Sequence, residues 1–389
     1  MIKPRIILEK IKPYFNTPQA IIITGMRRTG KTTLLNLIYT QIDSHNKIFL
    51  DLENPINRKY FEVENYEKIK KNFQLLGIDF SKKAFVFCDE IQFVKNLPSV
   101  VKYFYDHYQI KFFLTGSANF YLKNLFSESL SGRKFIFELY PLTFSEFLLF
   151  KEINLKIPKD PKEITRSIFD TILPFYEEYI LFGGFPQVVL ENDIARKKKI
   201  LEEIFTSFFQ LEIRQLGDFK KNEVVRDLML LLMQRAGSKL DIQKLSKELK
   251  VSRPTLTEYI YFLESTYFIK TIKPFSRNKD IEIRKMPKVY ICDSGLINHF
   301  AKVDMGVLFE NSIFQNLQQK GELNYYQRKS GVEIDFILNK EEAYEVKINA
   351  DESDLRRLKD LCKDLNIKKF KIISKNYSDL ENVVYGFNI

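Results

Sequence analysis

The feature that most constrains this chain is the segment AIIITGMRRTGKTTLL, residues 20–35. An apolar run, Ile21 to Thr24, leads into the pattern G-x-x-x-x-G-K-T, and a helix-like run follows. Strand, glycine-rich loop and helix in this order are typical of a phosphate-binding loop. Gly25 and Gly30 allow backbone conformations in which a Cβ would clash, so successive N–H groups can turn toward phosphate oxygens at the start of a helix. The segment therefore predicts a nucleotide-binding α/β domain.

The side chains of this loop predict ATP as the ligand and Mg²⁺ as its cofactor. Lys31 would reach the β and γ phosphates, and the Thr32 hydroxyl would ligate Mg²⁺. We expect the whole loop to surround the nucleotide, through Gly25, Met26, Arg27, Arg28, Thr29, Gly30, Lys31, Thr32 and Thr33.

A second motif, KKAFVFCDE at residues 82–90, is a buried strand pattern that ends in two carboxylates. Asp89 would hold the magnesium ion through water, and Glu90 would polarise the attacking water. Taken alone, an acidic pair after an apolar run is equally typical of a solvated strand end. Beside a phosphate-binding loop, the catalytic interpretation is favoured.

Two further segments complete the predicted nucleotide site. KFFLTGS, residues 111–117, is an apolar strand whose Thr115 or Ser117 can sense the γ-phosphate. LSGRK then places Arg133 in a loop before another strand. This cation would stabilise transition-state charge in its own subunit or in that of a neighbour, which would require a homo-oligomer; the alternative is a surface arginine.

These motifs together resemble a known family. The loop, Asp89-Glu90, LTGS, and SGRK followed by ELYPLTFSEF resemble the AAA+-type ATPase half of a widespread prokaryotic family, whose C-terminal half is classed only as a domain of unknown function. LFGGFPQVVL, YICDSGL and FEN are also similar to that family, so the resemblance covers nearly the whole chain. It implies ATP binding and hydrolysis, with a helical lid at residues 151–235. The double glycine of LFGGFPQVVL is equally compatible with a plain turn.

Residues 239–272 carry a helix-turn-helix pattern followed by a strand, which predicts a winged helix. Apolar residues recur at helical spacing, Ser252 can cap the second helix, and Pro254 suits its first turn. The positions expected to face a DNA groove are Arg253, Thr255, Thr257 and Glu258. Because Glu258 would repel phosphate, both a DNA-binding and a protein-docking winged helix remain open.

The net charge supports a polyanionic partner. It is +11, and residues 239–288 hold twelve Lys or Arg against six Asp or Glu, so more than half of the excess lies in about an eighth of the chain. Such a patch indicates DNA or RNA. The alternative is a basic protein from a Lys-rich proteome.

The last part of the chain has the predicted order helix, three strands, helix, strand, which resembles the core of PD-(D/E)xK nucleases. Asp335 on the second strand, Glu345 and Lys347 on the third, and Glu310 on the first helix fall at the signature places. The carboxylates of Asp335, Glu345 and Glu310 would bind Mg²⁺ or Mn²⁺, and Lys347 would orient or activate water. No Pro precedes Asp335, and the same residues can form the solvent-exposed face of a sheet. Cleavage of nucleic acid and binding without cleavage therefore both remain open.

The compartment is expected to be the cytoplasm. The first residues lack the apolar core of a signal peptide, and no apolar stretch approaches the roughly 20 residues of a membrane span. Cys88, Cys292 and Cys362 are too widely spaced for a disulfide framework or a zinc site.

The overall expectation is an α/β multidomain protein. Its predicted parts are a P-loop AAA+-type ATPase core (1–150), the helical lid (151–235), a winged helix-turn-helix (236–300) and a nuclease-like αβββαβ domain (301–389). Two functions fit: an Mg²⁺-dependent ATPase that binds DNA and cleaves it under ATP control, or a nucleotide-controlled switch or protein-docking ATPase whose nuclease-like domain is inactive.

Overall fold

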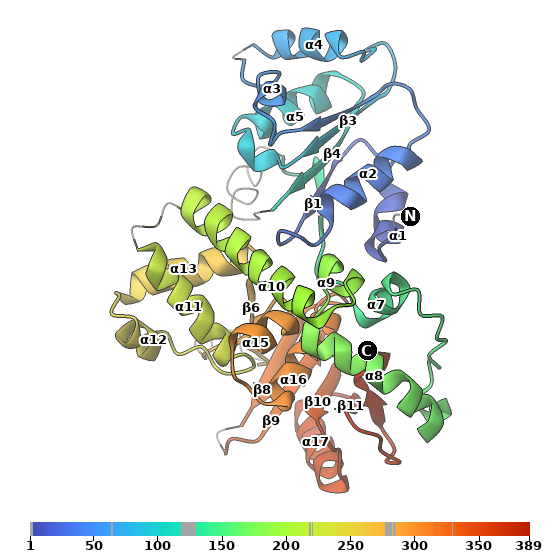
Figure 1. The fold of residues 1–389 in the computed structure, drawn as a ribbon, viewed down its shortest axis with the longest axis vertical. Coiled ribbons are helices and arrows are strands. Elements are labelled where there is room, and N and C mark those ends of the chain that lie inside the picture. The colour runs from blue at the N-terminus through green and yellow to red at the C-terminus, as the bar shows by residue number, and fades with distance from the viewer. Residues whose placement is uncertain are drawn as a thin grey trace. The chain divides into compact units, whose positions relative to one another are not determined.

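The computed structural model describes residues 3–63, 65–117, 130–217, 219, 221–276, 282, 285–328 and 330–389. The chain divides into two compact units (Figure 1). The first consists of Met1–Tyr140 with Ser265–Tyr267, and the second of Pro141–Glu264 with Phe268–Ile389.

The first unit is an α/β domain. Its strands are β1 (Ala20–Thr24), β2 (Lys47–Asp51), β3 (Ala84–Asp89), β4 (Ile110–Gly116) and β5 (Lys134–Glu138). Its helices are α1 (Ile7–Ile11), α2 (Lys31–Gln41), α3 (Pro55–Arg58), α4 (Tyr66–Leu75) and α5 (Leu97–His107), with short 3₁₀ turns η1 (Lys12–Tyr14) and η2 (Ile91–Phe93).

The five strands form a parallel sheet in the order β2-β3-β4-β1-β5. Both faces of β1 are buried, which is why its sequence is a continuous apolar run. Successive side chains point to opposite faces. Ile21 and Ile23 join the core that contains Leu34 of α2, whereas Ile22 belongs to the core on the other face. The predicted sequence of strand, loop and helix is confirmed, because β1 ends at Thr24 and α2 begins at Lys31.

The second unit begins with helices and ends in a sheet. Its helices are α7 (Phe144–Phe150), α8 (Arg166–Phe182), α9 (Pro186–Leu190), α10 (Ile194–Phe208), α11 (Asn222–Gln234), α12 (Ile242–Glu248), α13 (Arg253–Ser265), α15 (Ser294–Phe300), α16 (Met305–Leu317) and α17 (Glu352–Leu365). Its strands are β6 (Ile269–Pro274), β7 (Lys288–Ile291), β8 (Leu323–Gln327), β9 (Glu333–Leu338), β10 (Glu342–Lys347), β11 (Lys369–Ser374) and β12 (Val383–Tyr385). The shorter elements are the 3₁₀ turns η3 (Pro161–Glu163) and η5 (Gly386–Asn388) and the π-helical η4 (Phe209–Leu216).

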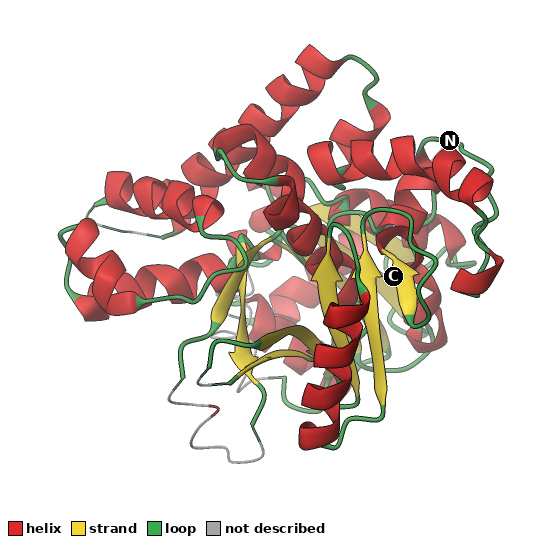
Figure 2. Cartoon of the chain, turned by 90° about the horizontal axis from the view of Figure 1, so that it is seen from below, coloured by secondary structure: helices red, strands yellow, loops and turns green. Residues whose placement is uncertain are grey.

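The strands of the second unit form one seven-stranded sheet in the order β12-β11-β10-β9-β8-β6-β7 (yellow in Figure 2). The elements α16, β8, β9, β10, α17 and β11 follow in the predicted αβββαβ order. The order α12, α13, β6, β7 is that of the predicted winged helix, whose second helix is capped by Ser252 Oγ, which accepts from the Thr255 N–H at 3.3 Å. However, β6 also pairs with β8, so the hairpin of this segment is part of the larger sheet.

A buried carboxylate explains the double glycine at the end of α8. Asp293 accepts hydrogen bonds from the backbone N–H groups of Gly184 (2.7 Å) and Gly295 (2.9 Å). At Gly183, whose φ is +75°, a Cβ would lie 1.8 Å from Asp293 Oδ1. Burial raises the pKa of Asp293 to about 6, against the hydrogen bonds that lower it. The LFGGFPQVVL and YICDSGL segments therefore contact each other, through the hydrogen bond from Gly184 to Asp293.

The helices at residues 166–234 lie in the same compact unit as the C-terminal sheet, and that unit starts at Pro141. The four predicted domains and the lid remain predictions. Among the described residues, no helix combines the length and the apolar character that crossing a membrane requires.

Candidate nucleotide site and carboxylate cluster

The phosphate-binding loop has a backbone that only glycine accommodates at its first position. Gly25 has a φ of +155°, and a Cβ there would lie 2.1 Å from the backbone oxygen of Leu139, the residue after β5. Gly30 has a φ of +94° and immediately precedes Lys31, the first residue of α2. Both glycines are thus fixed by sterics, as the sequence predicts.

Internal hydrogen bonds hold the loop in shape. The Lys31 ammonium donates to the backbone oxygens of Gly25 (2.9 Å) and Met26 (3.0 Å), and Thr29 Oγ1 donates to Met26 O at 2.9 Å. Arg5, which the sequence analysis did not single out, donates from Nη1 to Thr29 O at 2.9 Å. The buried Lys31 therefore lies beside the loop that would hold phosphate.

At the carboxyl ends of β3 and β4, Asp89 lies among hydroxyl groups. The hydroxyls of Thr115 and Thr32 donate to its carboxylate, and the Glu90 N–H donates to Thr115 Oγ1 at 3.3 Å. Asp89 is only 4% exposed, and burial raises its pKa although both hydroxyl bonds lower it. Carboxylate and hydroxyl oxygens are ligands that Mg²⁺ accepts. The donor set of Thr32 and Asp89 thus fits the expected ion.

Glu90 is positioned by Gln92, a residue that sequence reasoning missed. Glu90 adopts a left-handed conformation with a φ of +54°, and Gln92 Nε2 donates to its carboxylate. The same nitrogen donates to Ser117 Oγ at 3.2 Å. Gln92 thereby links the two side chains to which the sequence assigns the attacking water and the γ-phosphate.

Arg133 lies at the other end of the sheet. Its backbone oxygen accepts from the N–H of Ala20, the first residue of β1, while the phosphate-binding loop follows the last. Five residues of strand separate these ends by about 16 Å. Arg133 donates from Nε to Asp106 Oδ1 at 2.8 Å. The prediction that Arg133 acts on the nucleotide of its own subunit therefore does not agree with the structure; the neighbouring-subunit alternative remains a prediction.

In the second unit, a buried lysine lies at the centre of three carboxylates. Lys288 Nζ is 3.3 Å from Glu333 Oε1, 3.4 Å from Asp335 Oδ1 and 3.6 Å from Glu310 Oε1. Lys288 is 3% exposed. Burial lowers its pKa, but the carboxylates outweigh burial and raise it. Burial and the nearby Asp335 charge raise the pKa of Glu310 to about 7. Sequence reasoning had counted Lys288 only as part of the basic patch.

Glu345 has an unsatisfied oxygen. Its Oε1 is 2.8 Å from Lys347 Nζ, whereas Oε2 is buried and has no hydrogen-bond partner among the described residues. Burial, and then the charge of Asp335, raise the pKa of Glu345 to about 7. On the adjacent strand, Asp335 Oδ2 accepts from the Val346 N–H at 2.8 Å, which fixes Asp335 beside Glu345.

This arrangement changes the expected metal site. No three His, Cys, Asp or Glu side chains converge as metal ligands in the part of the chain that the structure describes. Glu310 instead accepts from the Tyr290 hydroxyl at 2.6 Å and faces Lys288. The predicted set of three carboxylates is therefore not assembled. Asp335 and Glu345, with the unpartnered Oε2, fit a single cation held by two carboxylates.

The predicted DNA-facing helix offers little positive charge. Arg253, Thr257 and Glu258 are exposed on α13, but the Thr257 hydroxyl donates to Arg253 O at 2.9 Å. Thr255 is only partly exposed, and its hydroxyl is 2.8 Å from Ser252 Oγ. Within the basic stretch 239–288, Lys288 is buried and paired, so it is not available to phosphate. Other members of that stretch, Arg277, Lys279 and Arg284, lie outside the described residues.

A family model matches most of the first unit. Residues 17–148 match the model of a family described as an AAA domain. Residues 174–306 and 305–385 match two models, each described as a domain of unknown function (DUF8612 and DUF4143). The parallel sheet, the loop and the AAA match together define a P-loop ATPase domain of the AAA class.

Two relatives match nearly the whole chain. An uncharacterized protein of Methanocaldococcus jannaschii is 30% identical over 385 residues, which cover 93% of this chain and 83% of the relative. An uncharacterized protein of Haemophilus influenzae is 27% identical over 395 residues, which cover 96% of this chain and 94% of the relative. The chain belongs to the same protein family as the Methanocaldococcus protein.

Similarities to solved structures are remote. The ORC1 protein of Aeropyrum pernix in complex with DNA is 13% identical with a TM-score of 0.37, over 82% of this chain and 95% of that chain. The ORC2 protein of the same organism, in its ADP form, is 12% identical with a TM-score of 0.32, over 70% and 89%.

Proposed function

We propose that this protein is an Mg²⁺-dependent ATPase whose second unit binds nucleic acid. The observation that carries the ATPase half is the polar cluster at the carboxyl edge of the parallel sheet, where the hydroxyls of Thr32 and Thr115 both donate to the Asp89 carboxylate. Ligands bind at this edge in open parallel sheets. The AAA match over residues 17–148 supports the same assignment.

Each residue of the cluster has a chemical task in this proposal. The loop N–H groups and the Lys31 ammonium bind phosphate oxygens, and Thr32 and Asp89 hold Mg²⁺, which supplies charge neutralisation when bound. Glu90, oriented by Gln92, polarises the attacking water. Ser117 shares the Gln92 amide, which supports its role as a sensor of the γ-phosphate.

Two substitutions test the ATPase. We expect Lys31→Ala to abolish ATP binding, because it removes the ammonium that the loop holds beside the phosphates. We expect Glu90→Gln to bind ATP but to lower kcat by about a hundredfold or more, because only the base is lost. ATP binding is measured by equilibrium dialysis and turnover by phosphate release.

Arg133→Ala serves as the comparison, because Arg133 is held by Asp106 at the opposite edge. In a monomeric preparation it should leave turnover unchanged. Equal phosphate release by the wild type, Lys31→Ala and Glu90→Gln would refute the ATPase assignment.

A second candidate function is metal-dependent cleavage of a phosphodiester by the second unit. It is favoured by one observation, the buried Glu345 Oε2 that lacks a partner among the described residues while Asp335 is held next to it. Lys347, 2.8 Å from Glu345, would orient the water or offset developing charge. The alternative is that a second unit of the same fold binds nucleic acid without cleaving it.

Metal binding and cleavage are tested separately. Mn²⁺ should raise the midpoint of thermal unfolding of the full chain, and Asp335→Ala should remove that increment, because binding to the folded state stabilises it. Cleavage is then assayed with plasmid, single-stranded DNA and RNA, with Mn²⁺ and ATP, beside an Asp335→Ala, Glu345→Ala double variant. Equal cleavage by the wild type and the double variant, or no cleavage by either, would exclude the nuclease activity. Nucleic-acid binding without cleavage would then remain as the function of the second unit.

A further inference from the structure

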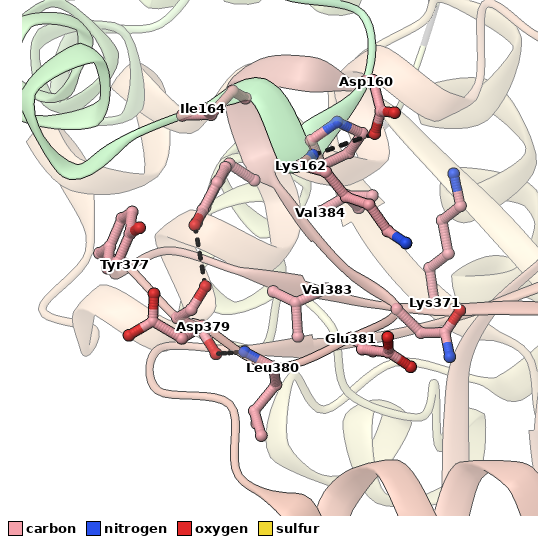
Figure 3. Close-up of a pocket in the computed structure, with 14 residues that line it drawn as sticks. Asp160, Lys162, Ile164, Lys371, Tyr377, Asp379, Leu380, Glu381, Val383 and Val384 are labelled. Atoms are coloured by element: carbon pink, nitrogen blue, oxygen red, sulfur yellow. Dashed lines mark hydrogen bonds between the residues drawn. The ribbon is translucent and has the colours of Figure 1, made fainter.

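Two surface pockets of similar volume are lined by described residues of the second unit. Figure 3 shows one of about 410 Å³, which η3 and the segment around β12 form. Its lining mixes Lys162 and Lys371 with Asp160, Asp379 and Glu381. Such a balance of charges does not favour either an anion or a cation.

The other pocket, of about 400 Å³, has a uniform charge. The described residues that line it are Lys239, Pro274, Lys285, Met286, Tyr325, Gln327 and Arg328. Three of these side chains are cationic, and none of the described lining residues is acidic. We call this pocket the basic pocket.

Of the three cations of the basic pocket, only Arg328 has a carboxylate partner among the described residues. Lys239 donates to the Gln327 side chain, which is a neutral amide. Arg328 pairs with Asp364, and these side chains are 39% and 58% exposed, so water screens the pair and it contributes little to stability. Lys285 is exposed. The basic pocket therefore keeps a positive potential that attracts an anion.

The basic pocket adjoins the carboxylates around Lys288. Lys239 and Lys288 face each other in an antiparallel β-bridge. Gln327 Nε2 donates to Glu333 Oε2 at 3.1 Å, and the Lys288 ammonium lies 5.7 Å from the centre of the Tyr325 ring. Since Lys288 also contacts Asp335, an anion in the pocket would lie next to the carboxylates to which the cleavage site is assigned.

We propose that the basic pocket binds the phosphodiester backbone of a nucleic acid and holds one phosphate beside Asp335. This inference rests on the proposed nucleic-acid binding of the second unit and specifies its site. It moves the principal contact from the exposed face of α13 to Lys239, Lys285 and Arg328. Phosphate contacts of this kind position a strand without reading its sequence.

The test is a binding titration with the full chain in EDTA, so that no cleavage is required. Fluorescein-labelled single-stranded DNA, duplex DNA and RNA of one sequence are the probes, and fluorescence anisotropy is the readout. We expect Lys239→Ala and Lys285→Ala each to weaken binding about threefold to tenfold and to lower the slope of log K against log salt by about one. Lys198→Ala, an exposed lysine on α10 of the same unit, is the matched control and should bind as the wild type does.

The outcomes separate this inference from the proposed function. If the two pocket variants bind as tightly as the wild type while Arg253→Ala weakens binding, the pocket is wrong and the α13 face carries nucleic-acid binding. If the wild type binds none of the three probes, the inference fails together with the nucleic-acid half of the proposed function, whereas the ATPase assay is unaffected. Lys285→Glu guards against a folding artefact, because this exposed side chain can reverse its charge without disturbing the core; unchanged binding would also overturn the proposal.

Discussion

The buried ammonium of Lys288 offers the sharpest test of how the second unit is held together. Replacing it by methionine in Lys288→Met keeps the length and the apolar stem of the side chain but removes the charge that faces Glu310, Glu333 and Asp335 at 3.3–3.6 Å. The three carboxylates would then repel one another around a buried position, with 22% of the Glu310 side chain and 34% of the Glu333 side chain exposed.

The expected loss of stability follows from burial. At an effective dielectric constant near 20, one pair of unit charges about 4 Å apart contributes about 4 kcal/mol. Removing the ammonium also removes the free-energy cost of burying it, which offsets part of the loss of the three contacts. Protonation of Glu310, whose pKa is already raised to about 7 by burial, offsets another part. Removing one partner of a buried charge network typically leaves a net loss of about 3–5 kcal/mol.

A surface lysine provides the matched control. Lys369 pairs with Glu342 at 3.2 Å, as close as the contacts of Lys288, but these side chains are 69% and 33% exposed. Lys369→Met should therefore cost less than about 1 kcal/mol. The substitution is the same in both variants, so the contrast measures the combined effect of burial and of three carboxylates instead of one.

The measurement is hydrogen exchange resolved by peptide, because the two compact units need not unfold together. Peptides from β7, β9 and α16 should lose protection in Lys288→Met, and Lys288→Met with Glu310→Gln should recover part of it, since one uncompensated charge is gone. Protection in Lys288→Met as high as in Lys369→Met would show that the ammonium does not neutralise the cluster.

Two further predictions concern single hydrogen-bonded groups. Gln92→Leu should lower kcat for ATP hydrolysis about tenfold with little change in KM, because it frees Glu90 without touching the phosphate-binding loop. A steady-state comparison checks this, and a KM effect without a kcat effect would contradict it. For Asp293, burial raises the pKa of the folded state from 3.8 to about 6, so the folded protein holds the proton more tightly than the unfolded chain. The protonated Asp293 carboxyl therefore stabilises the folded state fully below about pH 4, and this stabilisation is lost as the pH rises to about 6. The unfolding free energy of the wild type minus that of Asp293→Asn should fall by about 3 kcal/mol across that range. A difference independent of pH would contradict the shift.

Much of the local structure could be predicted because periodic patterns encode which face of an element is buried. The predicted order of helix, three strands, helix and strand in the last part of the chain coincides with α16, β8, β9, β10, α17 and β11. The apolar run before Gly25 correctly predicts a strand, which is buried on both faces in the structure. In these segments the information lies within ten or so consecutive residues, so no distant partner has to be known.

The local geometry of the candidate nucleotide site could also be predicted, because phosphate binding requires fixed spacing. A loop that wraps phosphate needs glycine where the φ angle is positive and a lysine at the start of the next helix, and these positions are close together in sequence. The fixed order of strands in a parallel sheet then brings Asp89 and Thr115 to one edge. Gln92 carries no such signal, since an amide two residues after an acidic pair is common in any surface turn.

Only the tertiary structure decided which charges meet. Lys288 and Asp335 are 47 residues apart, and no spacing rule links a strand residue to carboxylates on another strand and on a helix. The count of basic residues treated Lys288 as surface charge, whereas the pairing of β6 with β8 carries the β6–β7 hairpin into the larger sheet and places Lys288 among the carboxylates. Likewise, the position of Arg133 depends on the direction of β5 beside β1, which sequence leaves open. Patterns along the chain determine what each segment becomes, but the electrostatic partner of a buried charge depends on how the segments pack, because desolvation acts only after packing has excluded the water.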